Sequence, residues 1–570
     1  MKAFLSRSAI SKVYAAIIAI IVIVAIIAGA WYYASVSGPS ASTSPSPSPS
    51  ASPAANRVLI TSHPTPWYID PAVGSDLAST SSILNLYDPL VFPNNVGNAS
   101  TQGPVKPWIA TNWTASADGL IWTFTIRQGV TFHSGRTLNA SDVAFTMNRL
   151  LTMGQGFAYI FEPYVSNATA TDQWTVVFNM KRSFGPFLIS LVRLYIVDST
   201  TVMSHIATPG SYGTYGDYGT GWLVTNDAGS GPFKVKQNLP EAYLDMVRFA
   251  NYWGYMAPLA PTEYKVIAEP TSTTEYTMML ADQVSISSAW LPETTIKSLQ
   301  NVSGIYIANI AEPNEYYYMM NLLHPPLDDI HVRKALAYCL NYTDMVSKLY
   351  PRYTVATSCV PASVNGYADT TVYNYNVTAA QAELKLSKYY PDIVNNPNNY
   401  AINFYWISAV PIREQDALYF AADALAIGLK VNVIAEPWNS FVSGVADRGF
   451  SGMANVEVDS DYPEAGSLLA SRYSNNSMGT WTQMEWLNDS TFDTMLTTAL
   501  STINTTQRYA DYAQLQQYII NKCVGMNICD FSQVNAVQSY IHWPMASDPT
   551  QAVPVMGYNY DGRLIEIESH

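Results

Sequence analysis

Three acidic residues, each separated from the next by one residue, lie in the last quarter of the chain: Glu457, Asp459 and Asp461. In an extended segment alternate side chains point to the same side, so these carboxylates would share one face. A buried carboxylate that faces an ammonium group makes charge-assisted hydrogen bonds, which are stronger than neutral ones. The segment is therefore a candidate site for a cationic group; the alternative is an acidic loop on the surface.

Aromatic residues follow several predicted strands. Trp406 ends a strand in the second half of the chain, Trp438 comes just after the next strand, and Trp67-Tyr68 follow the first strand, predicted over residues 57–61. Ligands bind at the carboxyl ends of strands in α/β sheets, so we expect these side chains near a cleft. A cleft rich in Trp and Tyr stacks sugars as readily as it packs peptide side chains. The alternative is a place in the core or at the rim.

Motifs of catalysis are missing from the sequence. It contains no His-Glu-x-x-His, no Gly-x-Ser-x-Gly and no Gly-x-x-x-x-Gly-Lys-Ser/Thr, and its seven His residues are scattered without metal-ligand spacing. We therefore predict a protein that is not an enzyme and that needs neither a metal nor another cofactor.

A β-strand, helix, β-strand unit is predicted over residues 400–435. Residues 401–407 and 429–434 read as strands, residues 412–427 read as a helix, and Gly428 ends the helix. A right-handed crossover onto a parallel sheet follows, which is typical of α/β proteins. The apolar residues at helical spacing predict the buried face, namely Leu418, Ala421, Ala422, Leu425 and Ala426.

The best-patterned stretch covers residues 107–151. After a turn at Asp118-Gly119, apolar and polar residues alternate over residues 122–127, which predicts a half-buried strand. Residues 130–133 are expected to return as its hairpin partner. Asn139 and Asp142 then form a variant of the capping box at the start of a helix.

This stretch resembles the signature of the dipeptide/oligopeptide family (family 5) of extracellular solute-binding proteins of ABC transporters. Ser134 and Asn139 replace the usual residues of that signature. The matching residues are Ser116, Asp118-Gly119, Trp122-Thr123-Phe124, Arg127, Gly129-Val130, Phe132-His133, Gly135, Leu138, Ala140 and Asp142-Val143.

The resemblance implies an α/β, two-lobed fold like that of periplasmic binding proteins (type II, large cluster), with an extra subdomain in lobe one. Lobe one would cover residues 57–311, lobe two residues 312–527, and residues 528–570 would return to lobe one. Two crossings of the chain, near residues 311–315 and 525–533, would act as the hinge.

In this family an Asp-Tyr run lies at the cleft between the lobes, and its Asp pairs with the α-ammonium group of the ligand in peptide-binding members. Asp461-Tyr462 match that run and Glu464 matches its second acidic residue, but Pro463 comes one place early. The resemblance therefore implies that Asp461 and Tyr462 bind the ligand, beside the aromatic candidates Trp406, Trp438, Trp67 and Tyr68.

The implied function is the capture of peptides or oligosaccharides outside the cell and their delivery to the transmembrane subunits of an ABC permease. A surface glycoprotein or adhesin on the same scaffold is one alternative. A secreted hydrolase is another, and it would need a nucleophile or a pair of carboxylates in the cleft.

The charge of the chain is strongly negative, −14 at pH 7. All 43 acidic residues, and all but three of the 29 basic ones, lie after residue 56. Such a domain repels nucleic acid and anionic membrane surfaces, so no nucleic-acid partner is expected. Only 13% of the residues are charged, which would also suit an acidic medium; an ordinary polar extracellular surface is the alternative.

The N-terminus predicts a membrane anchor over residues 1–36. Three basic residues precede an apolar run over residues 13–30, and Trp31-Tyr32-Tyr33 follow it. The remainder would then lie on the extracellular face of the cytoplasmic membrane, at the cell surface. Residues 7–9 also resemble an archaeal prepilin-type signal, and residues 28–30 resemble a Sec cleavage site. Residues 37–56 form a linker rich in Ser and Pro.

Covalent modification is expected outside the cell. Local pairing of the four cysteines predicts disulfides Cys339–Cys359 and Cys523–Cys529. Glycosylation sequons, several of which arise by chance in so Asn-rich a chain, occur at Asn98, Asn112, Asn139, Asn167, Asn301, Asn341, Asn376, Asn475, Asn488 and Asn504.

Overall fold

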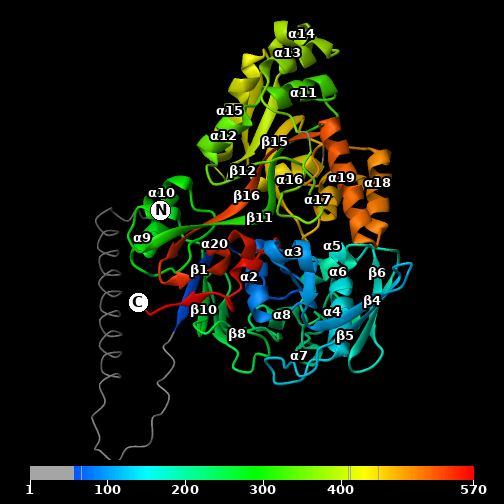
Figure 1. Cartoon of the computed structure of the whole chain (residues 1–570), viewed down its shortest axis with the longest axis vertical. Coiled ribbons are helices and arrows are strands. Elements are labelled where there is room, and N and C mark those ends of the chain that lie inside the picture. The colour runs from blue at the N-terminus through cyan, green and yellow to red at the C-terminus, as the bar shows by residue number, and fades with distance from the viewer. Residues whose placement is uncertain are drawn as a thin grey trace, which may run out of the picture. The chain divides into compact units, whose positions relative to one another are not determined.

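A four-stranded sheet opens the folded part of the chain (Figure 1). The computed structural model describes residues 57–569, apart from residues 66, 371, 409, 411 and 447 and the side chain of residue 100. The predicted N-terminal anchor and the linker lie outside these residues. The strand order is β1-β10-β9-β8, with β1 parallel to β10 and the other pairs antiparallel. The strands are β1 (Val58–His63), β8 (Phe233–Leu239), β9 (Tyr243–Arg248) and β10 (Glu263–Ala268).

A second sheet, of order β4-β5-β7-β6, carries the best-patterned stretch. It consists of β4 (Ala110–Ala115), β5 (Ile121–Ile126), β6 (Val165–Ala170) and β7 (Thr175–Met180). The predicted alternation in β5 is confirmed, since Trp122, Phe124 and Ile126 are buried. The expected hairpin with residues 130–133 is wrong. Strand β5 instead pairs with β4 on one side and with β7, which is distant in the sequence, on the other.

Helix α4 (Ala140–Met153) packs against this second sheet. The Asn139 side chain accepts a hydrogen bond from the Ser141 N–H, and the Asp142 carboxylate accepts one from the Asn139 N–H. These bonds satisfy backbone donors that the first turn of a helix leaves unpaired. The predicted capping box is therefore confirmed.

Two long antiparallel strands, β11 (Ile305–Met320) and β16 (Gly525–Gln538), run side by side through the molecule (Figure 1). They form the centre of a six-stranded sheet of order β12-β16-β11-β15-β13-β14. Their register shifts between Ala311 and Glu315, so the ladder is irregular where the chain was expected to cross between lobes. Bulges of this kind bend a strand and increase its twist. The lobe boundaries themselves remain predictions.

The predicted β-strand, helix, β-strand unit is present as β13 (Ile402–Ile407), α15 (Ile412–Ala426) and β14 (Val431–Glu436), with the two strands parallel. The predicted helix face is wrong, because Leu418 is 53% and Leu425 67% exposed. Helix α15 buries Asp416 and Phe420 instead. The buried side also carries Ala417 and Ala424, and the Asp416 carboxylate on it accepts hydrogen bonds from buried hydroxyl and amide groups of other elements.

The remaining elements complete the fold. Near the candidate site lie β15 (Gly452–Asp459), α17 (Ala465–Tyr473), η4 (Asn475–Ser477), α18 (Ser490–Ser501) and α19 (Thr505–Lys522). The others are α2 (Leu77–Leu86), β2 (Val91–Pro93), α3 (Val96–Gln102), β3 (Val105–Pro107), α5 (Ala158–Phe161), α6 (Phe187–Ser190), η1 (Leu191–Arg193), α7 (Ser199–Ser204), η2 (Gly213–Tyr215), α8 (Thr220–Leu223), α9 (Ser272–Leu280), α10 (Glu293–Gln300), α11 (Ile330–Cys339), α12 (Tyr342–Leu349), β12 (Thr354–Val355), α13 (Val377–Leu386), α14 (Asp392–Asn395), η3 (Pro397–Tyr400), α16 (Trp438–Ala446), β17 (Ile541–His542), α20 (Pro544–Ser547), η5 (Pro549–Gln551), η6 (Tyr558–Tyr560) and β18 (Glu566–Ile567).

The four cysteines are free and buried, so the predicted disulfides are not formed. Cys523 follows α19, whereas Cys529 lies four residues into the extended strand β16, which advances about 3.3 Å per residue. The extended strand therefore carries Cys529 further from Cys523 than the Cα–Cα distance of roughly 7 Å that a disulfide can span. Cys339 and Cys359 belong to different hydrophobic clusters.

Within residues 57–569, no helix that the structure describes combines the length and the apolar character needed to cross a bilayer.

Candidate ligand-binding site

A cleft of about 780 Å³ lies between the loop and helix residues around α5 and the helices α17 and α18. Tyr159, Tyr164 and Phe184 line one side, and Asp461 and Ser467 line the other. The second side is rich in hydroxyl and amide groups from α17, η4 and α18. The volume falls in the range of small-molecule sites, which is roughly 300–1,000 Å³. This cleft is therefore the main candidate for a ligand site.

The carboxylate of Asp461 enters the cleft without a cationic partner. Its Oδ1 accepts a hydrogen bond from the Tyr159 hydroxyl at 2.6 Å, and its backbone N–H donates to Ser467 Oγ at 2.9 Å. No Lys, Arg or His among the described residues forms an ion pair with it. Burial raises the pKa of Asp461, against the hydrogen bond from Tyr159 and the positive charge of Arg193. Asp461 thus has unused capacity to accept a charged donor.

Arg193, from η1, holds the backbone of this segment rather than its carboxylate. Its Nε donates to the carbonyl oxygen of Asp461 at 2.6 Å, and its Nη1 donates to that of Met556 at 3.0 Å. The guanidinium lies over the ring of Phe157, 4.6 Å from the centroid. Arg193 therefore ties together η1, the end of β15 and the C-terminal region.

Two further carboxylates, Glu312 and Asp459, lie beside this point. Asp459 ends β15 and is paired in register with Asn314 of β11, two residues after Glu312. Burial, and next the negative charge of Asp459, raise the pKa of Glu312 to about 8. Burial and the negative charges of Glu457 and Asp461 raise the pKa of Asp459 to about 7. Glu312 and Asp459 line the same small cavity, which accounts for the effect of one carboxylate on the pKa of the other.

The three acidic residues singled out in the sequence differ in whether a basic side chain pairs with them. Glu457 pairs with Arg413, whose Nη2 donates to its carboxylate at 2.5 Å, so its charge is compensated. Asp459 and Asp461 influence each other electrostatically and lack such a partner. The interpretation as a solvated acidic loop is not supported for these two, since both are partly buried.

Of the predicted aromatic residues, only Tyr462 lines the cleft; it is 5% exposed and packs edge-on against Phe184. Trp406 is buried in β13, and Trp67 is buried with its indole N–H donating to Asn238 Oδ1 at 3.3 Å. Trp438 is 41% exposed and packs against Trp481, and Tyr68 is 47% exposed. The structure does not bring these four residues to the cleft, and their role in binding remains a prediction.

Tyr159, Arg193 and Glu312 were not singled out from the sequence. Arg193 carried a weak signal, because it is a lone charge among apolar residues in residues 187–197, whereas Glu312 shares residues 305–320 with a second acidic residue, Glu315. Buried charges in such runs are rare unless paired or functional. Tyr159 carried no signal, since its position opposite Asp461 depends on contacts across 302 residues of sequence.

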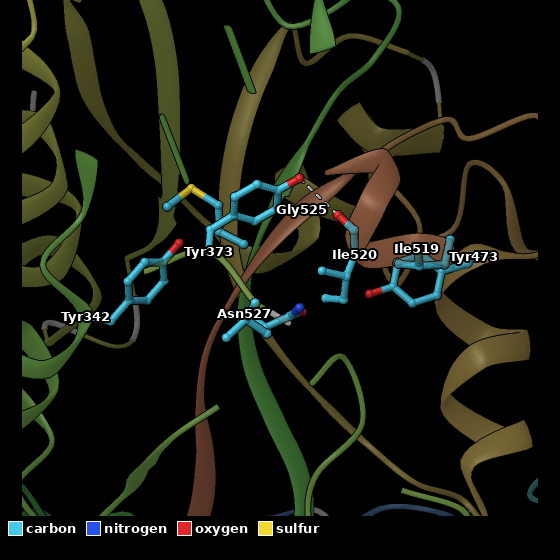
Figure 2. A pocket seen from close by; sticks show the side chains of 9 residues that line it. Tyr342, Tyr373, Tyr473, Ile519, Ile520, Gly525 and Asn527 are labelled. Atoms are coloured by element: carbon cyan, nitrogen blue, oxygen red, sulfur yellow. Dashed lines mark hydrogen bonds between the residues drawn. The ribbon is translucent and has the colours of Figure 1, made fainter. Parts of the chain in front are cut away.

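A separate cavity near α19 is too small for a ligand (Figure 2). Its volume is about 10 Å³, and its lining includes Tyr342, Tyr373 and Asn527. The Tyr373 hydroxyl donates to the carbonyl oxygen of Ile520 at 3.2 Å across it. A volume of about 10–15 Å³ holds one water molecule, so this cavity is a packing feature.

Comparison with known proteins places the chain among solute-binding proteins. Residues 104–480 match the model of the family described as "Bacterial extracellular solute-binding proteins, family 5 Middle". The probable D,D-dipeptide-binding periplasmic protein DdpA of Escherichia coli is 25% identical over 460 residues, which cover 80% of this chain and 85% of the relative. Heme-binding protein A of Haemophilus influenzae is 23% identical over 490 residues, which cover 80% and 84%.

Among solved structures, the chain is similar to the periplasmic binding protein DppA of Helicobacter pylori in complex with the peptide STSA. The TM-score is 0.71 with 20% sequence identity, and the match covers 90% of this chain and 98% of that one. Such neighbours are two-lobed periplasmic binding proteins, so the predicted two-lobed α/β fold is confirmed. Since the relatives are solute-binding proteins, the prediction that the chain is not an enzyme is also confirmed.

Proposed function

This chain belongs to family 5 of the bacterial extracellular solute-binding proteins, and we propose that it captures peptides outside the cell for an ABC transporter. Within the family the printed names of relatives include ligands as different as a D,D-dipeptide and heme. The ligand must therefore be argued from the site of this chain.

The observation that carries the proposal is the unpaired carboxylate of Asp461 in a cleft of suitable size. A peptide brings an α-ammonium group, which donates charge-assisted hydrogen bonds to such a carboxylate. A neutral oligosaccharide brings only hydroxyl groups and would leave the carboxylate charge without a counter-charge. The hydroxyl and amide groups of α17, η4 and α18 provide partners for the peptide backbone. These features favour peptides over oligosaccharides.

Delivery would follow closure of the lobes around the ligand. The long strands β11 and β16 join the parts of the chain on either side of the cleft, and their irregular register near Ala311 supports a hinge there. Ligand would shift an existing balance between open and closed states towards the closed one. The transmembrane subunits of an ABC permease would then accept the closed form.

The test measures affinity by titration calorimetry, with the full-length protein and matched peptides that carry either a free or an acetylated N-terminus. Loss of a hydrogen bond to a charged group costs about 1.5–3 kcal/mol, so acetylation should weaken binding roughly 10- to 150-fold. Asp461→Asn should weaken binding of the free peptide to a similar extent and should not affect the acetylated one.

Asp423→Asn is the matched control, because Asp423 on α15 is a half-buried carboxyl group with a raised pKa, outside the cleft and outside the predicted hinge. It should leave both affinities unchanged. Tight binding of oligosaccharides with no binding of peptides would contradict the proposal. Equal affinity for free and acetylated peptides would contradict the role of Asp461.

A further inference from the structure

A second, smaller cavity of about 60 Å³ is lined by Asp459, two residues before Asp461, at the junction of β11, β15 and β16. Its polar lining comprises Glu312 and Asn314 of β11, Asp459 of β15, and Ser532 and Gln533 of β16. We name it the Glu312 cavity. Neither the cleft contacts nor the hydrogen bonds of Asp461 use these residues. Its volume has room for a few water-sized groups, which is enough for a terminal ammonium group, about the size of one water, or for a guanidinium group with its four heavy atoms.

Two buried side-chain oxygens in the lining of the Glu312 cavity accept no hydrogen bond from the described residues. Asn314 is 7% and Gln533 5% exposed, and neither side-chain oxygen has a hydrogen-bond partner among the described residues. Their amide nitrogens are already engaged: Gln533 Nε2 donates to Asn535 Oδ1 at 2.8 Å, and Asn314 hydrogen-bonds to the Asp459 carboxylate. Buried acceptors left unpaired in this way cost free energy, which a bound donor would recover.

The carboxyl groups at the cavity have no basic side chain paired with them in the described part of the chain. Arg193 is the positive group that acts on Glu312, Asp459 and Asp461 together. Its Nε and Nη1 are engaged with backbone carbonyl oxygens, and it forms no direct ion pair with any of the three carboxyl groups. Glu312 does accept a hydrogen bond from Asn559 Nδ2 at 3.1 Å, but that donor is neutral.

Aromatic rings complete the lining. Tyr353 and Phe531 pack together with their centroids 4.4 Å apart, and Trp290 is 44% exposed at the cavity. Aromatic faces attract organic cations through the ring quadrupole. Within the described part of the chain, no group of three or more His, Cys, Asp or Glu residues is arranged to hold a metal ion. The chemistry of the lining therefore fits an organic cation.

We propose that the Glu312 cavity binds the cationic side chain of a peptide whose N-terminus is held by Asp461, so that this protein selects peptides containing lysine or arginine. The inference rests on the proposed function and names the ligand class of the same site. Glu312 and Asp459 supply the carboxyl groups, whose ionised form the bound cation favours. Asn314 and Gln533 supply further acceptors, and the aromatic rings cover the alkyl stem.

The test compares tripeptides that differ only in one residue, which is lysine, norleucine or glutamate at each position in turn. Norleucine has the alkyl stem of lysine without its charge. The full-length protein should bind the best lysine peptide at least tenfold more tightly than its norleucine counterpart, and the glutamate peptide most weakly of the three. Glu312→Gln and Asp459→Asn, which keep side-chain shape, should each reduce the lysine-to-norleucine ratio to about threefold or less.

Two controls separate the inference from the proposed function. Asp423→Asn should keep the ratio, and Asp461→Asn should weaken lysine and norleucine peptides by the same factor. Thermal unfolding of each variant reports whether it folds. Peptide binding with equal affinity for lysine and norleucine would overturn the inference and leave the proposed function standing. Absence of any peptide binding would overturn the proposed function, and the inference with it.

Discussion

Asp461 and Glu464 lie three residues apart in one segment, yet their surroundings differ completely. Glu464 is fully buried and accepts two hydrogen bonds from Arg508, at 2.6 and 2.9 Å, and one from the Tyr512 hydroxyl at 2.7 Å. Asp461 accepts a hydrogen bond from Tyr159, and its nearby arginine, Arg193, is directed to its backbone carbonyl oxygen.

The contrast separates structural carboxylates from carboxylates available to a ligand. Asp70 resembles Glu464, since Arg149 donates to both of its oxygens at 2.8 and 2.6 Å. A bidentate arginine uses the acceptor capacity of a carboxylate and compensates its charge. Asp461 and its neighbour Asp459 have no such partner, so a positively charged ligand can fill the role that arginine fills elsewhere.

The largest effect on the free energy of unfolding is expected from breaking the ion pair between Arg508 and Glu464. Arg508→Met removes the charge that compensates Glu464 and leaves a buried carboxylate unpaired. Removal of one partner of a buried ion pair typically costs about 3–5 kcal/mol, so the free energy of unfolding should fall by that amount. Urea denaturation followed by circular dichroism measures it.

Lys348→Met is the control for this substitution. Lys348 forms an ion pair with Asp344 on the surface, and its side chain is 62% exposed. Exposed pairs contribute about 0–1 kcal/mol, so stability should hardly change. A similar loss in both variants, or none in Arg508→Met, would remove the distinction between paired and unpaired carboxylates.

A comparable or smaller effect, roughly 3 kcal/mol between pH 5 and pH 8, is expected in the free energy of unfolding through the buried carboxyl group of Glu485. Neither of its oxygens has a hydrogen-bond partner among the described residues, and burial raises its pKa from 4.5 to about 8, against the positive charge of Arg472. Because the folded-state pKa is the higher one, the folded state binds the proton more tightly. This stability is fully present below about pH 4.5 and is lost as the pH rises through 8.

Urea denaturation at pH 5 and pH 8 tests this sign. Stability should be higher at pH 5, and Glu485→Gln should reduce the difference. Glu315, also fully buried with its pKa raised to about 8, adds a contribution of the same sign and survives in that variant. A protein that is more stable at pH 8 would contradict the prediction. Higher stability in weak acid would also agree with the acidic habitat suggested by the composition.

Removing the hydrogen bond that Tyr159 donates to Asp461 should change the free energy of peptide binding by about 1 kcal/mol and leave stability almost unchanged. Tyr159→Phe removes the hydroxyl that orients the carboxylate. A single hydrogen bond contributes about 0.5–1.5 kcal/mol, so peptide affinity should fall roughly two- to tenfold. Stability should change little, because the Tyr159 side chain is 52% exposed. Tyr255→Phe, at an exposed tyrosine outside the cleft, should leave affinity unchanged, and an equal loss there would contradict the role of Tyr159.

Sequence patterns predicted the local elements well. The alternation in β5, the cap at Asn139 and the unit formed by β13, α15 and β14 depend on residues close in the chain, and all are confirmed. The hairpin of β5 was predicted wrongly because its second neighbour, β7, comes from more than fifty residues further on. The face of α15 was predicted wrongly because the helix buries the neighbouring side, with Ala417, Phe420 and Ala424, on which Asp416 is satisfied by hydroxyl and amide groups outside the helix.

The site was predictable only in part, for the same reason. The carboxylates of Asp459 and Asp461 stood out by their spacing, and Asp461 also by the family resemblance. The sequence does not show which of the acidic residues pairs with a basic side chain. Glu457 is paired with Arg413, 44 residues away, and Glu464 with Arg508, also 44 residues away. Pairing is decided by tertiary contacts, and it determines which carboxylate remains for a ligand.

The smallest expected effect is the most discriminating one. Asp461→Asn should change the free energy of unfolding by less than about 0.5 kcal/mol, as is usual for substitutions that break no buried pair. The amide keeps an oxygen for the Tyr159 hydroxyl and removes a charge whose burial raises the pKa of the acid, so the two changes offset each other. The urea midpoint of the variant measures this against the large loss in Arg508→Met. A loss of several kcal/mol would mean that Asp461 supports the fold as Glu464 does, and that its unpaired carboxylate is not reserved for a ligand.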